Sequence, residues 1–230
     1  KKEFLETVSQ FDGVYIPGFY EPEYNEDGTI RNIRKLNDKA PDRVRRALIS
    51  DLEKADFPVK NIVPFIETVH DRSVVETFRG CTRGCRFCQA GMIYRPVRER
   101  KKETIERIAE EQLANTGHDE LSLLSLSTSD YSRFEDLATE LMEMCAAQNV
   151  ALSLPSLRLD SFSFKVLDEI QGYRKSGLTF APEAGSQRMR NVINKGLTEE
   201  VILDGAGKAF EGGWNKLKLY FMLGLPTETE

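Results

Sequence analysis

From residue 73 onward, hydrophobic positions alternate between two spacings. Short runs of β-branched, aromatic and leucine residues predict buried strands, and stretches with apolar residues every three or four positions predict amphipathic helices. The predicted strands are 74–78, 121–126, 150–154, 178–180 and 217–223. The predicted helices cover 105–113, 134–145, 164–170 and the stretches after 186 and after 198. Strands that alternate with helices in this way predict βαβ units and a parallel sheet.

The predicted strands are too few for a complete eight-stranded barrel. The chain begins with Lys1-Lys2-Glu3 instead of Met and stops soon after an apolar run, so both ends look cut. We therefore predict an α/β fold whose partial (βα) barrel is truncated after about five strands; an open, curved sheet is the alternative. Ligands in such folds bind at the carboxyl ends of the strands, so the loops that follow the strands are the candidate site.

The first seventy residues have a different character. Strand-like residues at 14–16 and 19–20, a turn signal over 25–28 and alternation over 29–33 predict a β-hairpin. A short polar helix is expected within 40–57. We assign residues 1–72 to an N-terminal extension or linker and residues 73–230 to the core domain.

Composition narrows the class of protein. Of the 230 residues, 40% are hydrophobic and 30% are charged, a balance that allows a globular core. No apolar run reaches 18 residues, so no membrane span is expected. The net charge of −5 argues against a general polyanion binder, although a basic run from Arg95 to Lys102 leaves nucleic acid open as a less favoured partner.

Cysteine spacing indicates the chemistry. Cys81, Cys85 and Cys88 lie within eight residues, in the loop after the first core strand. Such clustering indicates a metal site in a reducing compartment, which we expect to be the cytoplasm. Three thiolates can bind three irons of a [4Fe–4S] cluster and leave the fourth iron open. Gly80 and Gly84 would allow the tight turns that such a cluster needs.

Three arginines in this loop, Arg79, Arg83 and Arg86, would offset the negative charge of the cluster. A zinc-stabilised module is a rival, but structural zinc takes four protein ligands. Cys145 lies on the apolar side of a predicted helix, and the two histidines, His70 and His118, lack ligand spacing to the triplet. A non-catalytic iron–sulfur module for electron transfer is a second rival, and it would require a fourth cysteine ligand.

The cysteine triplet, with Phe87 directly before its last member, resembles the motif of the radical S-adenosylmethionine (SAM) superfamily. The stretches 76–81, 95–100 and 125–131 are similar, more narrowly, to bacterial radical SAM proteins of uncertain function. Members of that group usually carry a cobalamin-binding-type domain ahead of this segment. The resemblance thus implies a radical SAM type of partial barrel and allows cobalamin only through a domain outside this chain.

The resemblance also implies a reaction. One electron from the cluster would cleave bound SAM to a 5′-deoxyadenosyl radical, which abstracts hydrogen from a substrate that the sequence does not identify. A reductant such as flavodoxin or ferredoxin would supply the electron. Methyl or methylthio transfer to RNA or protein is the alternative within this enzyme class. No catalytic side chain is assigned.

Contacts to SAM are implied loop by loop. Phe87 would lie near the adenine, Glu183 would bind the ribose hydroxyls, and Arg158 and Lys195 would serve the carboxylate. The full set is Phe87, Ser127, Thr128, Ser129, Asp130, Ser156, Arg158, Glu183, Ser186, Lys195, Gly224 and Leu225. Residues 127–130 occupy the place of the superfamily's Gly-Gly-Glu motif but lack its glycines. Ser129 or Asp130 would cap the helix that begins near Arg133, a role that is compatible with a SAM contact.

Overall fold

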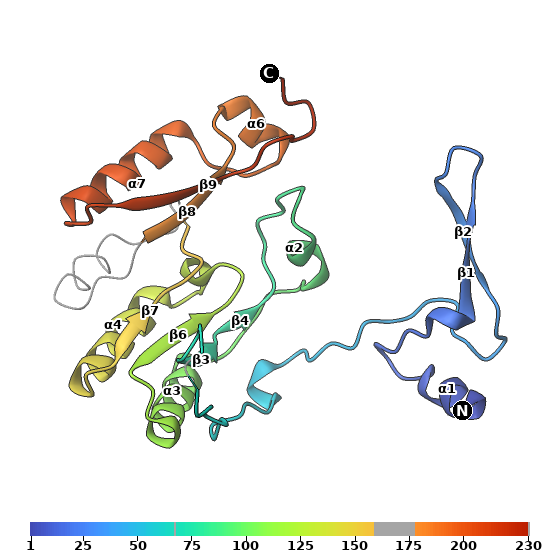
Figure 1. The fold of residues 1–230 in the computed structure, drawn as a ribbon, viewed down its shortest axis with the longest axis horizontal. Coiled ribbons are helices and arrows are strands. Elements are labelled where there is room, and N and C mark those ends of the chain that lie inside the picture. The colour runs from blue at the N-terminus through green and yellow to red at the C-terminus, as the bar shows by residue number, and fades with distance from the viewer. Residues whose placement is uncertain (67, 159–177, 230) are drawn as a thin grey trace. The chain divides into compact units, whose positions relative to one another are not determined.

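A computed structural model describes residues 1–66, 68–158 and 178–229 of the chain (Figure 1). These residues form two compact units, Lys1–Ser50 and Asp51–Glu230, which we describe separately. The division into an extension of residues 1–72 and a core of residues 73–230 stays a prediction. None of the helices in the described ranges is long and apolar enough to cross a membrane.

The first unit contains a short helix, α1 (Lys2–Val8), and the predicted hairpin, formed by β1 (Tyr20–Tyr24) and β2 (Ile30–Lys35). The strands pair antiparallel, and the turn between them closes where the Gly28 amide donates to the Asn25 carbonyl at 3.0 Å. The hairpin is confirmed. The strand-like residues 14–16 are irregular and precede a 3-10 turn at Pro17–Phe19.

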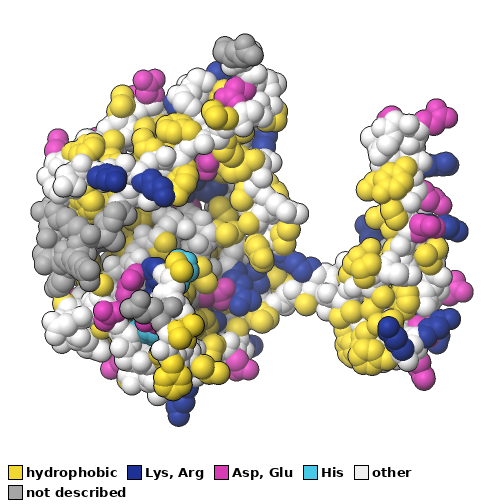
Figure 2. Space-filling model, viewed as in Figure 1, with side chains coloured by type: hydrophobic (Ala, Val, Ile, Leu, Met, Phe, Trp, Pro, Cys, Tyr) yellow, Lys and Arg dark blue, Asp and Glu magenta, His cyan; other side chains and the backbone are white. Residues whose placement is uncertain are grey.

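Apolar side chains remain exposed on this unit, as Figure 2 shows in yellow. Across the hairpin, Pro22 pairs with Ile33 and Tyr24 with Ile30. On the neighbouring register position, Glu21 binds Arg34. The exposed large hydrophobic residues of α1 and the hairpin are Phe4, Tyr24, Ile30 and Ile33. The hairpin is therefore amphipathic, with apolar and charged cross-strand pairs alternating along it.

The predicted helix within 40–57 is wrong. Only Leu52–Lys54 forms a single 3-10 turn, and residues 40–50 have no regular helix. An isolated helix shorter than about 12–15 residues needs an apolar face to pack against the protein. Here Leu52 is buried, but Leu48 and Ile49 in the stretch before it are exposed, so these apolar residues do not pack against the protein. Packing therefore fixes this segment at one point instead of along a helix.

The second unit contains two groups of parallel strands. The first group has the order β3-β6-β7, and the second pairs β8 with β9. Their bounds are β3 Ser73–Glu76, β6 Glu120–Leu124, β7 Ala151–Ser153, β8 Leu178–Glu183 and β9 Leu217–Phe221. This confirms an α/β fold with parallel strands. No hydrogen-bonded ladder joins the two groups within the described residues, so the partial barrel stays a prediction.

Helices follow the strands as the periodicity predicts. Their bounds are α3 Lys102–Thr116, α4 Phe134–Ala147, α6 Gln187–Val192 and α7 Glu199–Glu211. Gly117 is the C-cap of helix α3. It has a φ of 72°, and its backbone amide donates a hydrogen bond to the Leu113 carbonyl at 3.0 Å. The predicted helix over 164–170 lies outside the described residues.

Two local features were not predicted. The first core strand breaks at Thr77, and β4 (Phe78–Arg79) then pairs antiparallel with β5 (Arg98–Glu99). The short helix α2 (Gln89–Ile93) follows the third cysteine of the triplet. Segments of two and five residues are too short to show a hydrophobic period, which explains why the sequence pattern missed them.

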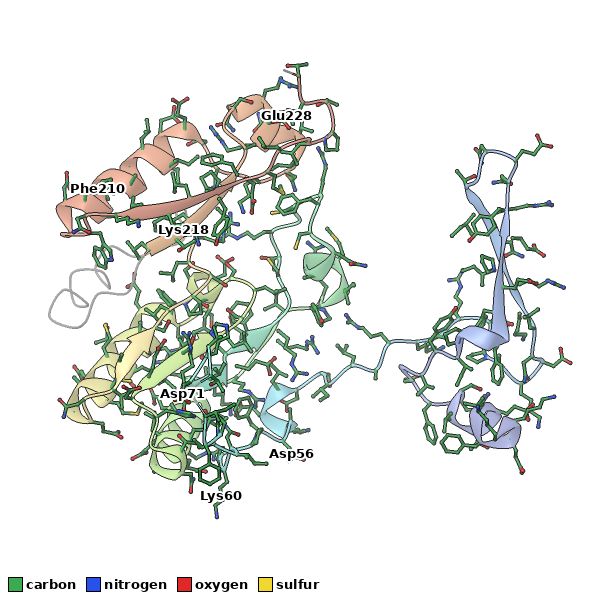
Figure 3. The ribbon with its side chains drawn as sticks, viewed as in Figure 1. Asp56, Lys60, Asp71, Phe210, Lys218 and Glu228 are labelled. Atoms are coloured by element: carbon green, nitrogen blue, oxygen red, sulfur yellow. The ribbon has the colours of Figure 1, made fainter. Side chains whose placement is uncertain are left out.

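The core lies between the three-stranded sheet and helices α3 and α4. Val75, Leu121, Ile105, Leu137 and Leu141 are completely buried there. In the second group, Phe180 of β8 joins the core, whereas the alternate residue Ala181 lines a pocket. Thr179, which precedes Phe180, is exposed and pairs with Lys218 of β9, the residue labelled in Figure 3. Alternation along β8 thus separates a core face from a site face.

Cys145 is the cysteine outside the triplet, and it is buried in the core as the sequence predicts. Burial raises the pKa of its thiol from 9.0 to about 11. The folded protein therefore keeps this proton between pH 9 and 11 while the unfolded chain releases it, so stability falls as pH rises through this window.

At pH 8 we expect a thiol reagent to modify Cys145 only on unfolding, as measured by labelling and peptide mass. Labelling in the native state at the rate of the denatured chain would contradict this.

Candidate cluster and cofactor site

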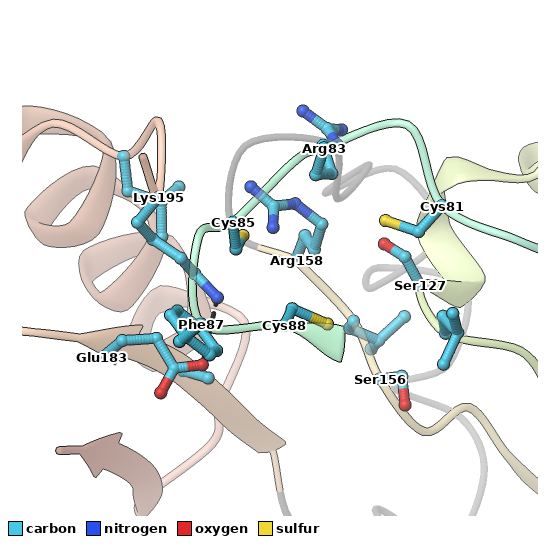
Figure 4. Close-up of a pocket in the computed structure, with 14 residues that line it drawn as sticks. Cys81, Arg83, Cys85, Phe87, Cys88, Ser127, Ser156, Arg158, Glu183 and Lys195 are labelled. Carbon is cyan, nitrogen blue, oxygen red and sulfur yellow. Dashed lines mark hydrogen bonds and ion pairs between the residues drawn. The ribbon is translucent and has the colours of Figure 1, made fainter. Parts of the chain in front are cut away.

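A pocket of about 260 Å³ opens at the carboxyl ends of the core strands (Figure 4). Its predicted members are Cys81, Cys85, Phe87, Cys88, Ser127, Ser156, Arg158, Glu183 and Lys195. Further lining residues are Arg83, Leu126, Leu157, Ala181 and Leu197. The structure thus gathers loops that follow β4, β6, β7 and β8 around one space, at the end where parallel α/β folds place their ligands.

The cluster loop, defined here as residues 79–91, depends on glycine at its start. Gly80 has a φ of 97°, a backbone region that side chains rarely adopt. A Cβ atom there would lie 2.7 Å from the Tyr94 carbonyl oxygen and 2.8 Å from that of Pro96. Gly84 also has a positive φ, of 75°. The glycines therefore fit the close turns that the sequence predicts for this loop.

Three distant groups fasten the cluster loop. The Nε of Arg95 donates to the Cys81 carbonyl at 3.1 Å, and Asn194 Nδ2 donates to the Gly84 carbonyl at 2.9 Å. The backbone amide of Arg86 donates to the Ile193 carbonyl at 2.9 Å. Sequence reasoning missed the contact roles of Arg95 and Asn194, because both side chains bind backbone carbonyls, and no sequence motif marks such a contact. The left-handed φ of Asn194, 55°, is typical of asparagine.

The thiols face the pocket. Cys81 and Cys88 direct their sulfur atoms into the same space in Figure 4. All four cysteines of the chain are free. The Gly91 amide donates to Cys88 Sγ at 3.3 Å, the kind of amide–sulfur contact that stabilises a thiolate. Within the described ranges, no three Cys, His, Asp or Glu side chains converge on a position for a single metal ion.

Ser127 supplies a test of whether the pocket fits a polar cofactor. The residue is 2% exposed, and its Oγ has no hydrogen-bond partner among the described residues. A buried hydroxyl without a partner is costly, so its retention calls for an explanation. Ser127 and Cys81 both line the pocket, and Figure 4 labels both side chains. The amino or carboxylate group of SAM would satisfy this hydroxyl, and the three thiols match in number and kind the donor set that an open [4Fe–4S] cluster would require.

Glu183 and Lys195 form an ion pair on the opposite wall. The Lys195 Nζ lies 3.2 Å from Glu183 Oε1, and the side chains are 9% and 15% exposed. Glu183 has a φ of 68° and Ser156 a φ of 59°. Non-glycine residues in this strained region gather at functional sites. The two residues together present carboxylate and ammonium groups, which suit hydroxyls and a carboxylate respectively.

The other predicted SAM contacts lie outside the pocket lining. Thr128, Ser129 and Asp130 form a 3-10 turn in which Thr128 and Ser129 are buried, and the Ser129 Oγ accepts from the Arg158 amide at 3.0 Å. The prediction that Ser129 or Asp130 caps α4 is wrong, because its N-cap is Arg133 and no side chain caps it. Ser186 instead caps α6 by accepting from the Met189 amide at 3.2 Å. Gly224 and Leu225 follow β9, away from the lining.

The basic run after the cluster loop has structural partners. Arg95 and Arg98 donate to backbone carbonyls, and Arg100 is buried with Nη1 2.6 Å from the Leu52 carbonyl. Lys102 is buried between Glu106 and Glu140. These contacts give four of the basic side chains a role in holding the fold.

Fold and site together define an α/β protein with a three-cysteine pocket at the strand ends, and residues 75–230 match the radical SAM superfamily. The chain belongs to the radical SAM superfamily. This membership confirms the superfamily predicted from the cysteine motif, whose enzymes use a [4Fe–4S] cluster and SAM as cofactors.

Curated relatives are similar over much of the chain. An uncharacterized protein of Methanocaldococcus jannaschii is 35% identical over 82% of this chain and 41% of its own length. A putative methylthiotransferase of the same organism is 27% identical, over 68% of the chain and 36% of its length. An uncharacterized methyltransferase of Pyrococcus horikoshii is 24% identical, over 99% of the chain and 47% of its length. The chain thus spans less than half the length of each relative.

Solved structures support the fold. The radical SAM methyltransferase TsrM from Kitasatospora setae, solved with cobalamin and a [4Fe–4S] cluster, matches with a TM-score of 0.56 at 16% identity. That match covers 68% of this chain and 32% of TsrM. The cobalamin-dependent SAM radical enzyme OxsB gives 0.57 at 14% identity, over 88% of this chain and 29% of OxsB.

Proposed function

We propose that this chain is the cluster- and SAM-binding core of a radical SAM enzyme that abstracts hydrogen from a substrate not yet identified. The observation that carries the proposal is the convergence of three free thiols, an unpartnered buried hydroxyl and the Glu183–Lys195 pair on one pocket. A non-catalytic electron-transfer module would need neither the hydroxyl nor the pair.

The residues have separate tasks in this proposal. Cys81, Cys85 and Cys88 bind three irons, and Ser127 donates to or accepts from the methionine portion of SAM. Glu183 accepts from the ribose hydroxyls, while Lys195 attracts the carboxylate. A reduced cluster held by these thiols would supply the one electron that cleaves SAM into methionine and a 5′-deoxyadenosyl radical. The apolar side chains of Leu126, Leu157 and Leu197 line the same pocket and exclude water.

The remaining proposals concern the surroundings of the enzyme. A flavodoxin or ferredoxin would deliver the electron, and the free thiols suit a reducing, cytoplasmic location. Of the predicted SAM contacts, we retain those that line the pocket and assign Phe87 to the adenine.

Anaerobic reconstitution tests the function directly. The protein is loaded with iron and sulfide, reduced in the presence of SAM, and analysed for iron, sulfide and 5′-deoxyadenosine. We expect about four irons per chain and 5′-deoxyadenosine that forms only with reductant and SAM together. Zinc that persists in place of iron, or a four-iron protein that never cleaves SAM, would contradict the proposal.

Methyl or methylthio transfer is the second candidate, because two relatives carry those names. The same reaction distinguishes the two if SAM carries an isotope in its methyl group. Label transferred to added RNA or protein favours the second candidate, and label confined to methionine favours hydrogen abstraction alone. Cobalamin would take part only through a further domain, because the proposal assigns none of the pocket residues to it.

A further inference from the structure

Arg83 and Asp130 join two loops that are 47 positions apart in the sequence. Arg83 stands between Cys81 and Cys85, and Asp130 ends the 3-10 turn after β6. Arg83 Nε donates to one carboxylate oxygen of Asp130 at 2.9 Å, and Nη2 donates to the other. Such a two-point fork fixes an arginine more firmly than a single contact does.

Asp130 belongs to a rigid support. The Thr128 amide in the same turn donates to the Ser156 carbonyl at 3.1 Å, and Ser129 accepts from the Arg158 amide. The turn is thereby tied to the loop after β7. The side chain of Asp130 is 16% exposed and that of Arg83 is 32% exposed, so water screens this pair less than it screens a surface pair.

We propose that Asp130 is a positioning residue that acts on the cluster through Arg83. The pair holds the cluster loop against the turn after β6, and it sets the net charge beside the cluster. This inference rests on the proposed function, since it requires a cluster on the three thiols. It replaces the predicted contact of Asp130 with SAM, because both carboxylate oxygens bind Arg83 and Asp130 does not line the pocket.

Charge balance gives the proposal a direction. One-electron reduction makes the cluster more negative, so a nearby positive charge favours the reduced form and raises its potential. The sequence predicts that Arg79, Arg83 and Arg86 offset the cluster's charge. In the structure Arg79 is paired with Glu76 at 2.7 Å and Arg83 with Asp130, so carboxylates compensate two of the three cations. The cluster is therefore kept harder to reduce than three unpaired arginines would make it.

The test is a redox titration of the reconstituted protein, followed by electron paramagnetic resonance of the reduced cluster. Asp130→Asn removes a negative charge and should shift the potential to a more positive value. Arg83→Gln removes a positive charge and should shift it to a more negative value. The double variant restores the net charge, so its potential should return toward that of the unmodified protein.

Loss of the Arg83–Asp130 pair can also be measured through the release of iron. Both single variants and the double variant should release iron to a chelator roughly fivefold faster, because each breaks a partly buried, charged hydrogen bond. Glu111→Gln is the matched control, since it breaks the Arg107–Glu111 pair at 2.8 Å on α3 and should change neither the potential nor iron release. If Asp130→Asn takes up no iron, Asp130→Glu, which keeps the charge, must recover both cluster and potential.

Two outcomes would overturn the proposal: single variants whose potentials equal that of the unmodified protein, or shifts of the same sign in both. Either result leaves the proposed function intact, because the cluster is present. If the unmodified protein binds no iron–sulfur cluster, the proposed function itself fails. The iron and sulfide content of the unmodified protein identifies this outcome.

Discussion

Replacing Cys81, Cys85 or Cys88 by Ala should abolish cluster binding. Each thiolate would hold one iron, and the described residues at the pocket offer no fourth cysteine to take its place. We expect iron content to fall from about four per chain to a few per cent of that value. The iron assay and the visible absorbance of the cluster both measure this loss. Circular dichroism checks that each variant remains folded.

Cys145→Ala is the control for this series. Cys145 is buried in the core with Leu141 and away from the pocket, so its loss should cost about 1 kcal/mol of stability and leave the cluster in place. Iron lost from this variant at the level of the triplet variants would show that the ligands are assigned wrongly.

Gly80→Ala should cost about 2–4 kcal/mol and distort the cluster loop. The new Cβ would meet the backbone carbonyls of Tyr94 and Pro96 at 2.7 and 2.8 Å, and backbone cannot rotate away as a flexible side chain can. Urea unfolding measures the stability, and iron uptake measures the loop. We expect both to fall together, because the residue after Gly80 is the first cysteine ligand.

Gly117→Ala separates the effect of backbone strain at a positive φ from the effect of a steric clash of the new Cβ atom. Gly117 has a similar positive φ of 72°, but nothing lies within 4 Å of the added Cβ. Its loss should cost only about 1 kcal/mol, through the strained helix C-cap, and iron uptake should not change. Equal effects in both variants would mean that close approach of the 94–96 backbone contributes nothing to the loop.

Sequence reasoning located the chemistry because its signals are local. The triplet of cysteines, the glycines beside them and the strand before them lie within one short segment, and they indicate the chemistry without further context. The long amphipathic helices α3 and α4 were predictable for the same reason, since fourteen or fifteen residues show several periods.

What escaped prediction depends on residues brought together by the fold. Arg95 and Asn194 hold the cluster loop through backbone carbonyls, which leave no trace in side-chain spacing. Asp130 looked like a ligand residue because of its loop, yet its partner Arg83 is known only once both loops are placed. The expected helix within 40–57 failed for the opposite reason, since local helix signals there had no surface to pack against.

The bond from Asn194 to the Gly84 carbonyl spans 110 positions of sequence. During synthesis at about 5–20 residues per second, the cluster loop leaves the ribosome roughly 5–20 s before this partner exists. Through that interval the three thiols have neither a fixed geometry nor the wall formed by Glu183 and Lys195. Iron delivered during that interval would meet a cluster loop without these partners, so we expect cluster insertion to follow synthesis of the segment that contains Glu183, Asn194 and Lys195.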